Sequence, residues 1–157
     1  MQKDFSTITE LPYSAVTELQ LKRTHQRYLF ASNYCRNRIV LEVGCGGGQG
    51  LNLLSQKADK VFAGDIHRTN TDICKKTYRN SPKIKILDNL DAQDLNFKAS
   101  SVDIIISFEL IYYLSDIDRF FFEANRILSK KGHLIICTTN KDWSDFNRSP
   151  FSTKYFS

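Results

Sequence analysis

The sequence predicts an α/β fold in which a doubly wound parallel sheet carries helices on both faces. Five short apolar runs of strand length alternate with segments of helical character along the chain. This alternation is typical of repeated βαβ units with right-handed crossovers. A glycine-rich or polar cluster follows each apolar run, and in a parallel sheet such clusters meet at one edge, where ligands bind.

A leading helix and the first strand open the predicted fold. Apolar residues recur at near-helical spacing over about 14–34, and Ser14 suits the N-cap of this helix. These residues are Val16, Leu19, Leu29 and Phe30. Residues 39–43 form a short apolar run that ends at a cluster of glycines, which indicates a buried strand.

The remaining elements continue the alternation. Strands are expected over 60–64, 83–87, 102–107 and 133–138, and helices over 50–57, 69–79 and 115–128. The helix over 69–79 ends before Pro82, because the residue before a proline avoids helical geometry. In the last helix, Asp116 and Asp118 occupy the first turn and the basic pair and glycine of 130–132 follow the end, as the helix dipole favours.

The length of 157 residues suits one domain over 1–157, with its core at about 38–140. No apolar run reaches the roughly 18 residues that a membrane-spanning helix needs, and the polar N-terminus does not resemble a secretory signal. The four cysteines lie far apart without a CxxC pair, and the three histidines show no metal-ligand spacing. We therefore expect a cytoplasmic protein with no membrane contact, no disulfide framework and no metal.

The net charge of +5 comes from 22 basic and 17 acidic residues, with the excess toward the N-terminal side. The densest basic stretch, residues 75–85, contains only one aromatic side chain, Tyr78. A nucleic-acid surface would interleave its basic residues with several stacking aromatics. This stretch is therefore interpreted as a solvated helix face and loop, and nucleic acid is not expected as a partner.

Glycine is concentrated at one place, because five of the seven glycines lie within residues 44–50. The cluster follows a strand and opens a helix, where glycine lets the backbone turn sharply and approach a ligand. A phosphate-binding P-loop is excluded, since no Gly-Lys-Ser/Thr occurs in the chain. The dinucleotide pattern GxGxxG fails from Gly44, Gly46 and Gly48 alike. What remains is GxGxGxG, preceded by Glu42 at the end of the strand.

Residues 40–50 resemble the first motif of class I S-adenosylmethionine-dependent methyltransferases, hydrophobic-hydrophobic-(Asp/Glu)-hydrophobic-Gly-Cys-Gly-x-Gly-x-Gly, at every position. Residues 61–66, 91–97 and 102–109 are similar to the second strand, the adenine loop and the fourth strand of that family. Residues 25–32 resemble the leading helix of bacterial members found among glycan and small-molecule methyltransferases. The resemblance implies a Rossmann-like sheet in the order 3-2-1-4-5, with S-adenosylmethionine as cofactor and S-adenosylhomocysteine as product.

The resemblance assigns the adenosyl part of the cofactor to two loops. Asp65, at the end of the second strand, would accept hydrogen bonds from both ribose hydroxyls. The Asp91 carboxylate would accept from the adenine amino group, while the backbone amide of Ala92 serves a ring nitrogen. Asp91 or Asp94 could instead be a structural cap of the loop.

The amino-acid end of the cofactor is assigned to residues near the glycine loop. Glu42 would hold the loop amides or interact with the ligand's ammonium group, and Tyr28 or Arg27 would cover that end. Tyr28 could equally be a core aromatic residue. The full set of expected cofactor contacts is Tyr28, Glu42, Gly44, Cys45, Gly46, Gly48, Asp65, Ile66, Asp91, Ala92 and Ser107.

The sequence departs from the family's pattern at two places. Many relatives carry Glu-His shortly after the position of Glu109, where this chain has Tyr112-Tyr113, so no catalytic residue is assigned. Relatives usually have two more strands after the fifth, whereas only 17 residues follow Asn140. Residues 141–157 are therefore expected to form an incomplete acceptor-side segment, which leaves the fifth strand as an exposed apolar edge.

These observations predict methyl transfer from S-adenosylmethionine to a small-molecule or glycan-type acceptor. A catalytically silent or truncated S-adenosylmethionine-binding module is the main alternative, and an RNA methyltransferase is a less favoured one. The exposed fifth strand would serve self-association or a partner protein.

Overall fold

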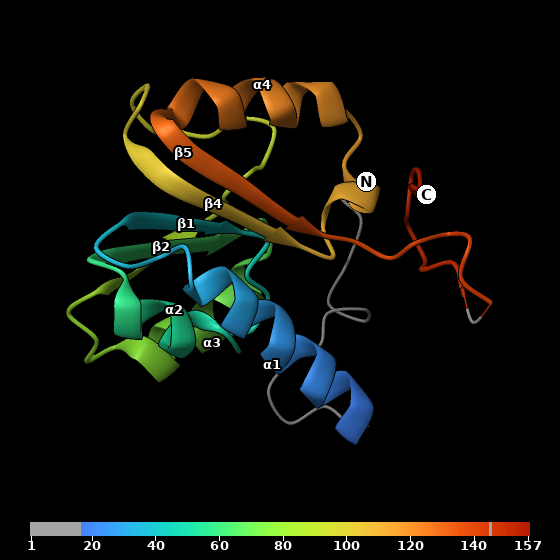
Figure 1. The fold of residues 1–157 in the computed structure, drawn as a ribbon, viewed down its shortest axis with the longest axis horizontal. Coiled ribbons are helices and arrows are strands. Elements are labelled where there is room, and N and C mark those ends of the chain that lie inside the picture. The colour runs from blue at the N-terminus through green and yellow to red at the C-terminus, as the bar shows by residue number, and fades with distance from the viewer. Residues whose placement is uncertain (1–16, 145) are drawn as a thin grey trace.

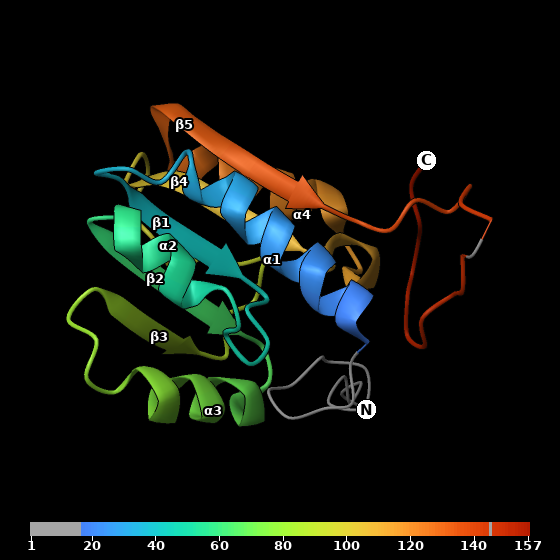
Figure 2. The same ribbon diagram turned by 60° about the horizontal axis from the view of Figure 1, so that its bottom comes forward.

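Five parallel strands form one sheet in the computed structural model, which describes residues 17–144 and 146–157. The strands are β1 (Ile39–Val43), β2 (Lys60–Asp65), β3 (Ile84–Asp88), β4 (Val102–Phe108) and β5 (Leu128–Cys137). They are hydrogen-bonded in the order β3-β2-β1-β4-β5, which confirms the predicted order. Figure 2 shows the strands running in one direction, so all their carboxyl ends lie at the same edge of the sheet.

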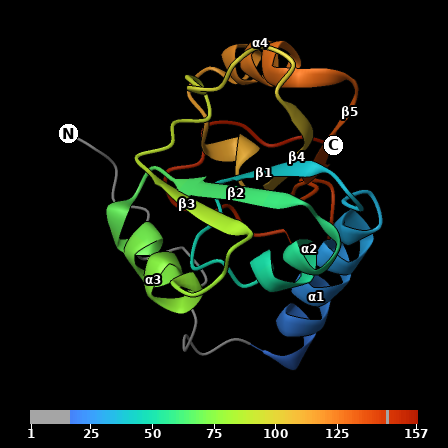
Figure 3. The same cartoon turned by 90° about the vertical axis from the view of Figure 1, so that its left-hand side faces the viewer.

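Helices cover both faces of the sheet, which confirms the predicted α/β class. α1 (Glu18–Ser32), α2 (Leu51–Lys57) and α3 (Arg68–Tyr78) lie on one face, and α4 (Ile117–Ile127) lies on the other (Figure 1 and Figure 3). A short 3-10 turn, η2 (Ile111–Tyr113), follows β4. None of the helices in the described parts of the chain is long and apolar enough to cross a membrane.

Alternate residues of the central strand β1 point to opposite sides of the sheet and join two separate hydrophobic cores. Val40 belongs to the core under α1 and α2, together with Leu51. Leu41 and Val43 belong to the core under α4, together with Phe120. Because β1 is packed on both faces, the glycine loop that follows it starts from a fixed point.

The leading helix begins later than predicted and buries a different face. Thr17 is the N-cap, and its hydroxyl accepts a hydrogen bond from the Gln20 backbone N–H at 3.2 Å; Ser14 and Val16 lie outside the described residues. The three described members of the expected apolar face are exposed: Leu19, Leu29 and Phe30. The buried residues of α1 are instead Tyr28, Ala31 and Ser32. Only the C-terminal end of α1 is packed against the body of the protein, so small residues and one tyrosine form the contact there.

The fifth strand begins earlier than predicted, at Leu128 rather than His133. Leu128 pairs with Val102 as soon as α4 ends, and a register shift follows before His133 pairs with Ile104. Residues 130–132, predicted to follow the end of a helix, therefore belong to the strand. Pairing with β4 begins directly where α4 ends, so these residues lie in a strand instead of a loop after the helix.

β5 forms one edge of the described sheet, as expected. Leu134 to Cys137 are half-buried, and the chain then turns back so that Asn140 forms an isolated bridge with Phe156. A partner or a second copy at this edge stays a prediction.

Candidate functional site

A cavity of about 1310 Å³ lies at the carboxyl edge of the sheet, where the loops after all five strands meet and α1 forms one wall. Eight of the expected cofactor contacts line it: Tyr28, Gly44, Cys45, Gly46, Asp65, Ile66, Asp91 and Ala92. Glu42, Gly48 and Ser107 do not, because Glu42 and Ser107 are buried within strands and Gly48 faces α3. No described residue from 75 to 85 lines the cavity either, so the basic stretch lies elsewhere.

Three glycines in the loop after β1 adopt left-handed backbone angles that other residues rarely adopt. The angle φ is +73° at Gly44, +51° at Gly46 and +76° at Gly48. The N–H groups of Gly44 and Cys45 both donate to the Gly64 carbonyl, at 2.9 and 3.0 Å, which ties the loop to β2. A Cβ atom at Gly48 would lie 2.8 Å from the sulfur of Cys74, so this glycine allows close packing on α3. Direct contact of Gly48 with a cofactor stays a prediction.

The carboxylate of Asp65 holds this loop and also faces the cavity. Its Oδ2 accepts a hydrogen bond from the Gly46 N–H at 3.0 Å, and its Oδ1 accepts one from the His67 N–H at 2.9 Å. Only 8% of the residue's surface is exposed. Since each carboxylate oxygen can accept two hydrogen bonds, both oxygens keep capacity for a ligand diol.

Asp91 stabilises the turn after β3. Its Oδ1 accepts hydrogen bonds from the backbone N–H of Gln93 at 2.8 Å and from the side-chain amide of Gln93 at 3.3 Å. Its carbonyl accepts from the Asp94 N–H at 3.2 Å. Asp91 is therefore a structural cap, as the alternative interpretation has it. Asp91 and the buried Ala92 also line the cavity, so a ligand there can reach Asp91, and its contact with adenine stays a prediction.

Glu42 is buried beneath the glycine loop, with 1% of its surface exposed. Its Oε1 accepts a short hydrogen bond from the Tyr28 hydroxyl, and its Oε2 has no hydrogen-bond partner among the described residues. Burial raises the pKa of Glu42 to about 7 and raises the pKa of Tyr28 well above its ordinary value. Asp65, rather than Glu42, holds the amide of Gly46.

Tyr28 is both a core residue and part of the cavity wall. Its ring packs edge-on against Phe108 with the centroids 5.1 Å apart. It also lies directly against Gly50, where a Cβ atom would overlap the ring. Gly50 has φ of −99°, so the close approach of Tyr28, not the backbone angle, requires glycine at this position.

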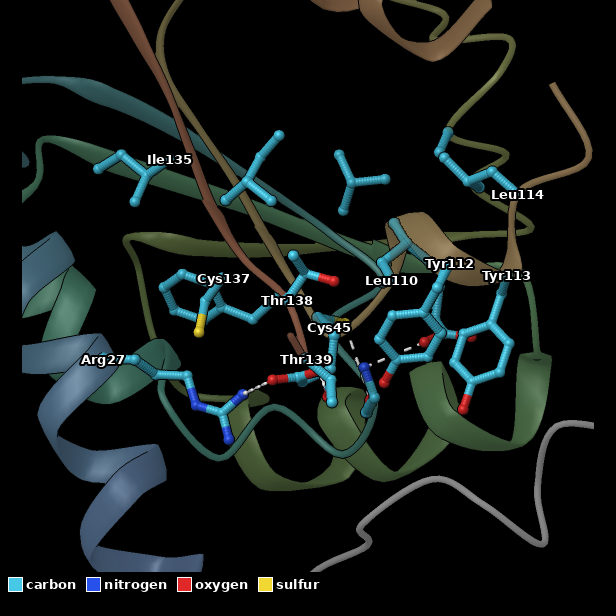
Figure 4. Close-up of a pocket in the computed structure, with 18 of the residues that line it drawn as sticks. Arg27, Cys45, Leu110, Tyr112, Tyr113, Leu114, Ile135, Cys137, Thr138 and Thr139 are labelled. Carbon is cyan, nitrogen blue, oxygen red and sulfur yellow. Dashed lines mark hydrogen bonds and ion pairs between the residues drawn. The ribbon is translucent and has the colours of Figure 1, made fainter. Parts of the chain in front are cut away.

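The half of the cavity formed after β4 and β5 contains an ion pair that the sequence analysis did not predict. Nη1 of Arg27 lies 3.3 Å from Oε1 of Glu109, and Oε2 of Glu109 accepts a hydrogen bond from the Thr139 hydroxyl at 2.9 Å. Figure 4 shows Arg27 reaching from α1 toward the side where Thr139 lies. Arg23, one turn earlier on α1, stacks on Trp143 at 5.2 Å. The four-residue spacing of the two arginines indicates a shared helix face, but spacing could not identify their distant partners.

The aromatic C-terminal residues fold back onto η2 and pack against Tyr112 and Tyr113, which line this half of the cavity. The ring of Tyr155 stacks on Tyr112 with the centroids 4.8 Å apart, and the Thr153 N–H donates to the Tyr112 carbonyl at 2.7 Å. The hydroxyls of Tyr113 and Ser149 lie 2.5 Å apart. Burial raises the pKa of Tyr112 and of Tyr113, so both phenols are neutral near pH 7.

Cys45 behaves as a small packing residue. It is buried beside Cys74, and its hydrogen bond with Cys74 together with burial raises the pKa of the Cys45 thiol, which disfavours the reactive thiolate. The described residues contain no group of three or more His, Cys, Asp or Glu side chains that could hold a metal ion.

A glycine loop after β1 and acids after β2 and β3, gathered at the carboxyl edge of a parallel sheet, are typical of α/β proteins that bind ligands at that edge. A family model described as "Methyltransferase domain" matches residues 41–136. The chain therefore belongs to the S-adenosylmethionine-dependent methyltransferase family.

Individual relatives agree with this assignment. A probable S-adenosylmethionine-dependent methyltransferase of Mycobacterium tuberculosis is 33% identical over 107 residues, which cover 68% of this chain and 38% of that protein. A ubiquinone biosynthesis O-methyltransferase of Pelagibacter ubique is 27% identical over 106 residues, which cover 68% of this chain and 44% of that protein. The solved structure of a SAM-dependent methyltransferase from Aquifex aeolicus matches with a TM-score of 0.70 at 19% identity, covering 90% of this chain and 82% of that one. The chain thus spans less than half the length of the two curated relatives.

Proposed function

We propose that the protein transfers a methyl group from S-adenosylmethionine to a small-molecule or glycan-type acceptor. The observation that carries the proposal is the convergence of the glycine loop, Asp65 and Asp91 on one cavity at the carboxyl edge of the sheet. When bound, S-adenosylmethionine supplies a methyl group on a sulfonium that is already activated for transfer. The protein's contribution is then mainly to position the reactants and to exclude water.

The residues around the loop fit such a cofactor. The left-handed glycines let the backbone at positions 44 and 46 border the cavity with no side chain in the way. Asp65 keeps acceptor capacity for the two ribose hydroxyls, and Asp91 and Ala92 border the place proposed for adenine. Oε2 of Glu42 has no hydrogen-bond partner among the described residues, but Glu42 is buried behind the loop and does not line the cavity, so its contact with the ligand's ammonium group stays a prediction.

The size and charge of the cavity support a small acceptor. A single drug-sized ligand needs roughly 300–1000 Å³, so a cavity of about 1310 Å³ has room for a cofactor and a second molecule. The basic stretch of residues 75–85 lies outside the cavity, and one of its lysines, Lys75, is already paired with Asp88. Both points favour a small acceptor over RNA. The similarity to a ubiquinone biosynthesis O-methyltransferase also supports a small molecule.

Calorimetry with S-adenosylhomocysteine tests the cofactor site. We expect wild type to bind and Asp65→Ala to bind roughly 10- to 100-fold more weakly, because one charge-assisted hydrogen bond contributes about 1.5–3 kcal/mol. Asp59→Ala is the matched control, since Asp59 is an exposed acid at the opposite end of β2. No binding to wild type, or equal binding to all three proteins, would remove the site assignment.

A silent S-adenosylmethionine-binding module is the second candidate. Tyr112 and Tyr113 stand where many members of the family carry Glu-His, which favours a loss of acid–base function there. This candidate predicts normal S-adenosylhomocysteine binding without transfer of labelled methyl to any acceptor. Methyl transfer by the purified chain would exclude it.

A further inference from the structure

Glu109 occupies an unusual backbone position at the end of β4. Its φ is +52°, a left-handed angle that non-glycine residues rarely adopt, and its N–H donates to the Cys137 carbonyl at 2.8 Å. Such geometry persists only where the surroundings enforce it, and it clusters at functional sites. Here it turns an acidic side chain toward the cavity, which Glu109 lines with 34% of the side chain exposed.

The carboxylate of Glu109 is fixed from two sides. Arg27 of α1 contacts Oε1 at 3.3 Å, and the hydroxyl of Thr139 donates to Oε2 at 2.9 Å. The phenol of Tyr112 also interacts with this carboxylate, so three of its roughly four acceptor positions are taken and one remains for a bound molecule. The acid is oriented but not fully occupied, which is the condition for accepting a proton from a bound molecule.

No other described carboxylate lies in this half of the cavity. The other two acids among the lining residues are Asp65 and Asp91. They follow β2 and β3, which lie on the other side of β1 from β4 and β5, where the cofactor is proposed to bind. Tyr112 and Tyr113 are neutral phenols that can donate hydrogen bonds but do not take up a proton. Glu109 is thus the proton acceptor available beside the space that remains for a second substrate.

We propose that Glu109 is the catalytic base of this site and that the acceptor is a neutral hydroxyl compound. The inference rests on the proposed methyltransferase function. As the hydroxyl oxygen forms its bond to the methyl carbon, the bond from that carbon to the sulfonium sulfur breaks and the sulfur keeps the electron pair. The hydroxyl proton passes to the carboxylate of Glu109 and later to solvent.

The charge of the surrounding wall distinguishes a hydroxyl from an ammonium acceptor. Arg23 and Arg27 both line this half of the cavity from the same face of α1. A cationic amine beside Glu109 would therefore lie close to the guanidinium of Arg27, on a wall that also carries the guanidinium of Arg23, and be repelled by this positive charge. A neutral hydroxyl group meets no such penalty, and it is the weaker nucleophile that needs a base.

Labelled methyl transfer to matched probes tests the inference. The hydroxyl probes are catechol, glycerol and methyl glucoside, and the amine probes are benzylamine, ethanolamine and glucosamine. We expect wild type to methylate at least one hydroxyl probe at oxygen. In Glu109→Gln, kcat/KM should fall about 100-fold or more, the lower range for loss of a general base. Its affinity for S-adenosylhomocysteine, measured by calorimetry, should stay within about threefold of wild type.

Two further variants guard against misfolding and non-specific effects. Thr139→Val removes one orienting hydrogen bond and should lower kcat/KM about tenfold, whereas Asp118→Asn changes an exposed acid on α4 and should change neither measurement. Full activity of Glu109→Gln would overturn the inference. So would methylation of amines alone, or S-adenosylhomocysteine binding by wild type without methylation of any hydroxyl probe. Failure of wild type to bind S-adenosylhomocysteine would instead overturn the proposed function itself.

Discussion

The buried acid Glu42 makes the stability of this protein depend on pH in a way that one substitution should remove. Burial raises the pKa of Glu42 from 4.5 to about 7. The folded protein therefore holds this proton more tightly than the unfolded chain does. The resulting stabilisation is complete below about pH 4.5 and is lost as the pH rises through about 7. At 1.36 kcal/mol per pKa unit, the loss amounts to about 3 kcal/mol.

Glu42→Gln keeps the shape of the side chain and an oxygen for the Tyr28 hydroxyl but has no proton to lose. The variant and wild type should be similarly stable at pH 4.5, where Glu42 is protonated in the folded protein. At pH 8 the variant should be more stable by up to about 3 kcal/mol.

Urea denaturation with linear extrapolation at both pH values measures this difference. The contributions of all other titrating groups cancel when the two proteins are compared at the same pH. A stability difference between variant and wild type that does not change with pH would refute the assignment of a protonated, buried Glu42.

Three further variants test other contacts. Gly50→Ala should lower the free energy of unfolding by about 1–3 kcal/mol, because the added methyl overlaps the Tyr28 ring. In a Tyr28→Ala background most of that loss should vanish, and additive losses in this double-mutant cycle would contradict the overlap. Arg126→Met should cost about 2 kcal/mol in urea denaturation, because the buried carboxylate of Glu123 loses its shorter ion pair and keeps only Arg119 at 3.7 Å. A neutral outcome would show that the pair with Arg126 contributes little. Glu123→Gln should show the opposite pH dependence to Glu42→Gln, because the hydrogen bond from Arg126 lowers the pKa of Glu123. The stabilisation by Glu123 is therefore present above about pH 4.5 and is lost as the pH falls. The same pH trend in both variants would contradict this.

The parts of the fold that depend on local patterns were predictable from the sequence. The run 39–43 and the clustered glycines after it predicted β1 and its loop, and the structure places both as expected. The positions of Asp65 and Asp91 at one edge followed from the rule that parallel strands end on the same side. Periodicity failed for α1, because only its C-terminal end is buried and the spacing of Leu19, Leu29 and Phe30 does not reveal that.

Contacts between distant parts of the chain were beyond reach of the sequence pattern. Nothing in the local spacing indicates that Arg27 pairs with Glu109, which is 82 positions away. The early start of β5 at Leu128 depends on pairing with β4, which outweighs the helix-favouring charges beyond it. Both features are tertiary in origin, and tertiary packing overrides local preference.

The glycine loop contains two kinds of glycine, and they limit in different ways which residues relatives can carry at these positions. Gly44, Gly46 and Gly48 have left-handed backbone angles, which disfavour most other residues whatever their neighbours are. Gly50 is required only because the ring of Tyr28 occupies the space of its missing side chain. Across relatives, position 50 should therefore covary with position 28, a larger residue at one accompanying a smaller residue at the other. Positions 44, 46 and 48 should instead stay glycine whichever residue occupies position 28.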